Sequence, residues 1–113
     1  MNSISKTDVD KIFGKILRDF RIKNNLTQDN LSEKLGISLK YISRIENGNS
    51  GLKTQTLINC MNILGISPNT IYKDFITNEN VKLQIELSEK MNTLSEEKLL
   101  FLNSIIDLLN NLK

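Results

Sequence analysis

Apolar residues recur every three or four positions along most of the chain, which predicts a succession of amphipathic helices. The first helix is expected to begin at Thr7, since Asp10 stands where the acid of a capping box would stand. It is expected to end near Asn24 and Asn25, because asparagine tolerates the left-handed conformation that follows a helix. Its predicted buried face consists of Val9, Ile12, Phe13, Ile16, Leu17 and Phe20.

Two shorter apolar stripes follow between Thr27 and Gly48. Leu31 and Leu35 are four residues apart, and Ile42 and Ile45 are three apart. Each pair gives a short helix one apolar side. We therefore expect two short helices that pack against each other.

The residues between these stripes predict a tight turn. Gly36 can adopt a positive φ at no steric cost and so end the first short helix. Ser38 is then suited to cap the second helix. Ser32 is small, which would let the second helix cross the first at close range.

Two more helices complete the predicted first domain. One runs from about Thr54 to Leu64 and the other starts at Ser67 and Pro68, as N-cap and first helical residue. Cys60 is interpreted as a buried filler of the first of these. The apolar residues expected to close the core are Leu57, Ile58, Met61, Leu64, Ile66, Ile71, Tyr72 and Phe75.

Residues 79–113 carry a different pattern. The alternation from Val81 to Leu87 would suit a strand, but Leu83, Leu87 and Met91 also repeat every four residues, which favours a helix. Ser95 is expected to cap a last helix. The stripe of that helix is Leu99, Leu102, Ile105, Ile106, Leu109 and Leu112. Two helices of this size, joined as a hairpin, have too little interior to bury so many apolar residues, so their apolar face needs a partner.

Charge separates the same two segments. Residues 1–78 hold eleven Lys and Arg against seven Asp and Glu, a balance of +4, whereas residues 79–113 hold four against six, a balance of −2. The basic excess therefore lies with the paired short helices, as expected for a domain that contacts nucleic acid.

The chemistry of catalysis is missing from the sequence. It contains no histidine and one cysteine, and it has no glycine-rich phosphate loop. We therefore predict that the protein is not an enzyme and needs neither metal nor cofactor. A single cysteine, an N-terminus with early acids and the absence of a long apolar run predict a cytoplasmic protein outside the membrane.

The segment TQDNLSEKLGISLKYISRIENG resembles the helix-turn-helix of the lambda repressor and Cro-like family, also called the XRE family. Ser32 is the one departure, standing where the family usually has alanine. The positions that agree with the family pattern are Thr27, Gln28, Leu31, Gly36, Ile37, Ser38, Ile42, Ser43, Glu46 and Gly48. The resemblance implies an all-α fold, in which a five-helix DNA-binding domain at residues 1–78 is followed by a helical hairpin at residues 79–113.

The resemblance also implies which residues touch double-stranded DNA. Residues 38–47 would read the major groove, while neighbouring residues would hold phosphates. The implied base contacts are Leu39, Lys40, Ser43 and Arg44. The implied phosphate contacts are Gln28, Tyr41, Asn47 and Lys53. Arg21 and Glu46 are implied to form a structural pair between the first helix and the end of the recognition helix.

Together these inferences predict that the protein is a homodimeric repressor that dimerises through residues 79–113. Two alternatives remain open at this stage. The C-terminal segment of an antitoxin or antirepressor would bind a protein partner while the helix-turn-helix holds DNA. The fold could instead serve as a protein-interaction module that binds no DNA.

Overall fold

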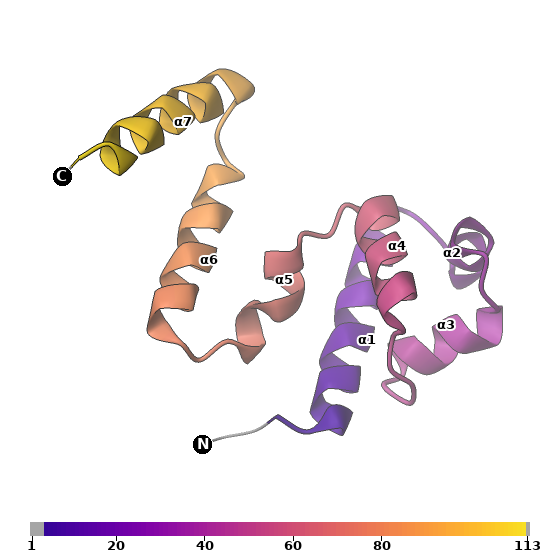
Figure 1. Ribbon diagram of the computed structural model, residues 1–113. Coiled ribbons are helices and arrows are strands. Elements are labelled where there is room, and N and C mark those ends of the chain that lie inside the picture. The colour runs from indigo at the N-terminus through magenta and orange to yellow at the C-terminus, as the bar shows by residue number, and fades with distance from the viewer. Residues whose placement is uncertain (1–3, 113) are drawn as a thin grey trace. The chain divides into compact units, whose positions relative to one another are not determined.

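The computed structural model describes residues 4–112, which form seven α-helices, one 3₁₀ helix and no strand (Figure 1). The predicted all-α fold is thereby confirmed. The chain divides into two compact units between Phe75 and Ile76, called here the first and the second unit. The helices are α1 (Lys6–Lys23), α2 (Gln28–Leu35), α3 (Leu39–Glu46), α4 (Thr54–Leu64), α5 (Pro68–Tyr72), the 3₁₀ helix η1 (Lys73–Phe75), α6 (Glu79–Met91) and α7 (Glu96–Asn110).

The core of the first unit is built by all of its five α-helices. Buried side chains come from one inward face of each helix, because residues three or four apart lie on the same side. They are Leu17, Leu31, Ile42, Ile45, Leu57, Cys60, Leu64 and Ile71, and Ile66 joins them from the connection between α4 and α5. At the edge of this core the ring of Phe13 meets Tyr72 and Phe75 edge to face, at centroid distances of 6.0 and 5.6 Å.

The start of α1 differs from the prediction by two residues. Ser5 is the N-cap, with its Oγ accepting a hydrogen bond from the Asp8 N–H at 3.1 Å, so Thr7 already lies inside the helix. Asp10 is not a capping acid. It is buried and forms an ion pair with Lys6 at 3.2 Å. The end of α1 was predicted correctly, with Asn24 as C-cap and Asn25 at a φ of 59°.

The inward face of α4 also differs in one residue. Ile58 was predicted to be buried but is 47% exposed. The inward positions belong to Leu57, Cys60 and Leu64, and Ile58 lies about 100° or more around the helix from each of them. Cys60 is buried as predicted.

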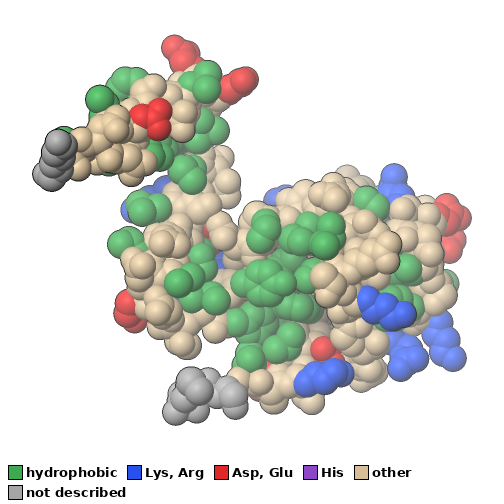
Figure 2. Space-filling view, in the orientation of Figure 1, with side chains coloured by type: hydrophobic (Ala, Val, Ile, Leu, Met, Phe, Trp, Pro, Cys, Tyr) green, Lys and Arg blue, Asp and Glu red, His purple; other side chains and the backbone are tan. Residues whose placement is uncertain are grey.

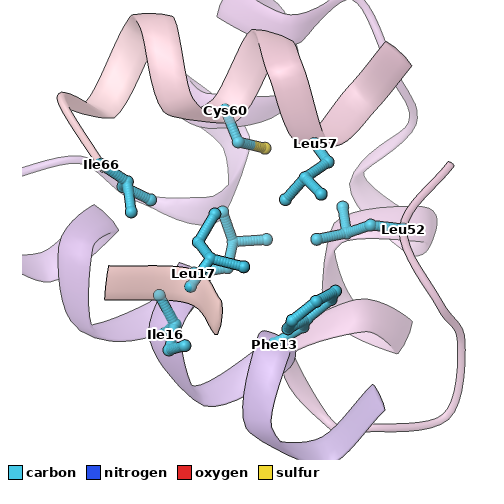
Figure 3. A pocket seen from close by; sticks show the side chains of 8 residues that line it. Phe13, Ile16, Leu17, Leu52, Leu57, Cys60 and Ile66 are labelled. Carbon is cyan, nitrogen blue, oxygen red and sulfur yellow. The ribbon is translucent and has the colours of Figure 1, made fainter. Parts of the chain in front are cut away.

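A small cavity lies within this core, lined by side chains of α1, α4 and the segments beside α4 (Figure 3). Phe13, Leu17, Leu52 and Leu57 point toward one another around it, with the sulfur of Cys60 at its edge. Its volume of about 10 Å³ is at the lower limit for a single water molecule, and apolar cavities of this kind stay dry. The cavity is packing space and cannot hold a ligand.

The second unit consists of α6 and α7. The segment that could have been a strand is helical from Glu79 to Met91, as preferred from its four-residue repeat. Ser95 caps α7, accepting a hydrogen bond from the Lys98 N–H at 3.3 Å. Neither helix contains a buried residue. The unit therefore has helices with good local signals but no interior of its own.

Candidate nucleic-acid interface

The turn between α2 and α3 is set by two residues. Gly36 ends α2 with a φ of 66°, the left-handed conformation that was predicted for it. Ser38 then caps α3, with its Oγ accepting a hydrogen bond from the Tyr41 N–H at 3.1 Å. Ser32, on the inward side of α2, is buried and donates its hydroxyl hydrogen to the Asp29 carbonyl at 2.7 Å. The left-handed glycine and the serine cap therefore end α2 at Leu35 and begin α3 at Leu39.

Helix α3 separates an inward face from an outward face. Ile42 and Ile45 are 0% and 1% exposed, so the helix is held firmly by the core. Leu39, Lys40 and Arg44 are exposed, and Ser43 is half-buried beside them. The four predicted base contacts thus lie on the helix in which they were expected, and three of them are exposed.

Basic side chains gather around this part of the first unit. Figure 2 shows Lys and Arg side chains over the end that α2 and α3 form, with acidic side chains beside them. The leucine at the start of α3 is 46% exposed among these charges. An accessible apolar side chain beside basic groups can contact a thymine methyl group, while the basic groups contact guanine.

A buried ion pair ties α1 to the end of α3. The guanidinium of Arg21 donates two hydrogen bonds to the Glu46 carboxylate, at 2.8 and 2.9 Å, and a third to the Leu26 carbonyl at 2.8 Å. The two side chains are 12% and 3% exposed. The hydrogen bond to Glu46 raises the pKa of Arg21 above its ordinary value, against the opposing effect of burial. The Arg21–Glu46 pair therefore holds α1 and the C-terminal end of α3 together.

The predicted phosphate contacts lie around α3, but their side chains differ in freedom. The Gln28 amide donates a hydrogen bond to Glu46 Oε1 at 3.2 Å, which leaves its second N–H hydrogen for another acceptor. Asn47, the C-cap of α3, and Lys53, the N-cap of α4, are both exposed. Tyr41 is half-buried, and its hydroxyl bonds to backbone atoms of the loop between α3 and α4.

Gly14 is a structural residue that the sequence pattern did not reveal. It lies on α1 where that helix crosses the C-terminal end of α3, and a Cβ at this position would overlap the Ile45 carbonyl oxygen. The same Cβ would lie 3.2 Å from the Glu46 carbonyl oxygen. Glycine is needed here for close approach of two backbones. The sequence shows only that Gly14 lies within the apolar stripe of α1. It does not predict that the backbone of Ile45 lies against it.

Residues 4–112 offer neither a metal site nor a helix that could span a membrane. Across that range no group of three or more His, Cys, Asp and Glu residues could hold a metal ion. Within the same residues no helix is both long and apolar enough to cross a membrane.

Two short helices joined by a left-handed turn, seated on three further helices, define a helix-turn-helix domain. A family model described as "Helix-turn-helix domain" matches residues 14–81, which is more than half of the chain. The chain belongs to this family, in agreement with its resemblance to lambda repressor and Cro-like regulators. None of the curated proteins compared with the sequence matches it. Because helix-turn-helix domains place their second helix in the major groove, the family indicates a DNA-binding regulator.

Proposed function

We propose that the protein is a sequence-specific transcriptional regulator, a homodimeric repressor that reads double-stranded DNA with residues 38–47. The observation that carries this proposal is the outward face of α3, where Leu39, Lys40 and Arg44 are exposed although Ile42 and Ile45 are fully buried. Because the inner face of α3 is packed against the core, the helix can present its outer face to the major groove of DNA without bending. We expect it to act in the cytoplasm.

Each residue on this face has a distinct chemical role. Lys40 and Arg44 would donate hydrogen bonds to guanine O6 and N7, and Leu39 would contact a thymine methyl group. Ser43 would bond to a base or to a phosphate. Gln28, Asn47 and Lys53 would hold phosphate oxygens and so fix the register of the helix without reading sequence.

The dimer contact is proposed to lie in the second unit. Val81, Leu83 and Leu87 of α6 are exposed, together with six large apolar side chains of α7 and Leu112, which follows it. Apart from Leu100, which lies between polar residues of α7, these side chains are available for a specific interface, to which each partner contributes about 800 Å². A second copy of the same surface would cover it symmetrically.

The DNA proposal is tested by reversing charge on α3. Wild-type protein first enriches duplexes from a random-sequence pool, and binding of the enriched duplex is then measured by fluorescence anisotropy. We expect a Kd on the order of 10⁻⁸ to 10⁻¹⁰ M for the wild type. The Lys40→Glu/Arg44→Glu variant should lose at least about 100-fold, because it loses two base contacts and gains repulsion from phosphates.

A matched control is available on α1. Lys15 and Arg18 are also one exposed lysine and one exposed arginine, so Lys15→Glu/Arg18→Glu changes the net charge equally without touching α3. We expect this control to stay within about fivefold of the wild type, since only long-range attraction is altered. Equal losses in the two variants, or no enrichment by the wild type, would contradict sequence-specific binding through α3.

The dimer is tested with two leucines of α7 in the full chain. Leu108 and Leu100 are 68% and 64% exposed. By helical spacing Leu108 shares its face with Phe101 and Leu112, whereas Leu100 lies between the polar Asp107 and Asn111. In sedimentation equilibrium, Leu108→Ser should weaken the dimer by at least about tenfold, and Leu100→Ser should change it little. A wild-type chain that remains monomeric would argue that the face awaits another protein.

A further inference from the structure

Tyr41 joins the recognition helix to the loop that follows it. Its ring is half-buried and packs against the core of the first unit. Its hydroxyl donates a hydrogen bond to the Gly51 carbonyl at 3.1 Å and accepts one from the Lys53 N–H at 3.3 Å. One side chain of α3 thus holds two backbone groups between α3 and α4.

These bonds leave the hydroxyl nothing to offer a phosphate. A tyrosine hydroxyl has a single hydrogen, and this hydrogen is already donated to Gly51. A phosphodiester oxygen can only accept hydrogen bonds. Direct contact between Tyr41 and the DNA backbone would therefore require this bond within the protein to break.

Lys53 is the residue that this arrangement positions. It is the N-cap of α4, with its carbonyl accepting from the Leu57 N–H at 2.9 Å, and no side-chain hydrogen bond caps this end. The hydroxyl of Tyr41 holds the Lys53 N–H from the other side. The place where α4 begins is therefore fixed relative to α3, while the lysine side chain stays exposed.

We propose that Tyr41 is a positioning residue that aims Lys53 at a DNA phosphate and does not itself touch DNA. This inference rests on the proposed DNA-binding function. A phosphate contact that is rigidly linked to α3 fixes the depth and register of that helix in the groove. Without the hydroxyl, the loop would lose two hydrogen bonds and Lys53 would spread over more conformations.

The test compares Tyr41→Phe, Lys53→Gln and the double variant in the full chain. Tyr41→Phe keeps the ring in the core and removes only the bridging oxygen. Tyr72→Phe is the matched control, because Tyr72 is the only other tyrosine of the chain and lies on α5. Binding is measured on the enriched duplex and on a scrambled duplex over a series of KCl concentrations, with thermal melting as the check on folding.

We expect Tyr41→Phe to weaken binding by about threefold to tenfold on both duplexes, as loss of a modest hydrogen bond and its phosphate contact would. The slope of log K against log [KCl] should become shallower by up to about 0.9, the value for one phosphate contact. In the Lys53→Gln background the tyrosine change should cost nothing further. Without DNA, the Lys53 amide should exchange its hydrogen faster in Tyr41→Phe than in the wild type or Tyr72→Phe.

Three results would overturn the inference alone, with wild-type binding intact. The first is that the losses of Tyr41→Phe and Lys53→Gln add fully in the double variant. The second is that the salt slope stays unchanged in Tyr41→Phe. The third is that the Lys53 amide exchanges at the same rate in Tyr41→Phe and in the wild type. A wild-type chain that binds neither duplex would overturn the proposed function and this inference together. Amide exchange is read without DNA, so it separates the two failures.

Discussion

The two units of this protein are built from the same kind of helix but differ in what the helices enclose. In the first unit nine apolar residues are buried. In the second, within residues 76–112, none is, and ten of the sixteen exposed large apolar residues of the described chain lie there. Both units have capped, amphipathic helices. The difference is that five helices can surround an interior, whereas two cannot.

Caps and apolar stripes are therefore sufficient for a helix but not for a core. Asn78 caps α6 and Ser95 caps α7 with hydrogen bonds as good as those in the first unit. Such caps contribute on the order of 1 kcal/mol each, which does not replace burial of a dozen apolar side chains. The apolar side chains of the second unit are therefore left for a contact beyond the unit itself, which the proposed dimer would supply.

The largest effect should come from the Arg21–Glu46 ion pair of the first unit, whose side chains are 12% and 3% exposed. Glu46→Ala leaves the Arg21 guanidinium buried opposite no carboxylate, so we expect the free energy of unfolding to fall by about 3–5 kcal/mol. Urea denaturation of Glu46→Ala, Arg21→Ala and the double variant measures it. Glu33→Ala, at an exposed glutamate of α2, is the control. Additive losses in the double variant would mean that the two side chains do not interact.

A leucine from each unit gives the most direct comparison. Leu31→Ala, at 0% exposure, should destabilise the first unit by about 2–5 kcal/mol, because it removes contacts and leaves a cavity. Leu83→Ala, at 53% exposure, should change the same transition by less than about 0.5 kcal/mol. Thermal and urea unfolding of both variants decide it. Similar losses would show that the second unit contributes to the core of the first.

Close backbone contact between α1 and α3 is a further property of the first unit. Gly14→Ala should cost about 1–3 kcal/mol, because α1 must move away from the Ile45 carbonyl. Gly14→Ser should cost at least as much, since it is larger. At an ordinary helical glycine, the change to alanine leaves stability equal or higher. If Gly14→Ala is as stable as the wild type or more stable, α1 and α3 can move apart at no cost.

The smallest expected effect concerns the buried thiol. Burial raises the pKa of Cys60 to about 11, above the ordinary value of 9.0. As the pH rises above 9, the unfolded chain loses this proton first, so the free energy of unfolding falls until about pH 11. The loss should reach about 1 kcal/mol at pH 10. Cys60→Val, which cannot ionise, should show a flatter profile; parallel profiles would contradict the burial effect.

What could be predicted from the sequence was local. Gly36, Ser38, Asn25 and Ser95 act within a few residues of themselves, so their neighbours along the chain were enough to place the turns and caps. Ser5 was missed because Thr7 offers the same chemistry two residues later. The helical type of α6 followed from its repeat.

What could not be predicted depends on contacts between helices. The contact of Gly14 with Ile45, the exposure of Ile58 and the bonds from Tyr41 to Gly51 and Lys53 each require the relative positions of two elements. The resemblance to a family named Arg21 and Glu46 as partners, but the third hydrogen bond, to Leu26, needed coordinates. The type and spacing of residues do not give the distance in space between segments that are far apart along the chain.

The shortness of the recognition helix has a consequence for its motions. With eight residues, α3 is below the about 12–15 residues at which an isolated helix becomes even marginally stable in water. Its order is supplied by α1, through Gly14 and Arg21, and by its two buried isoleucines. We therefore expect the amides of α3 to exchange with solvent only when the whole first unit opens. Heating should abolish DNA binding at the same midpoint as it abolishes the fold.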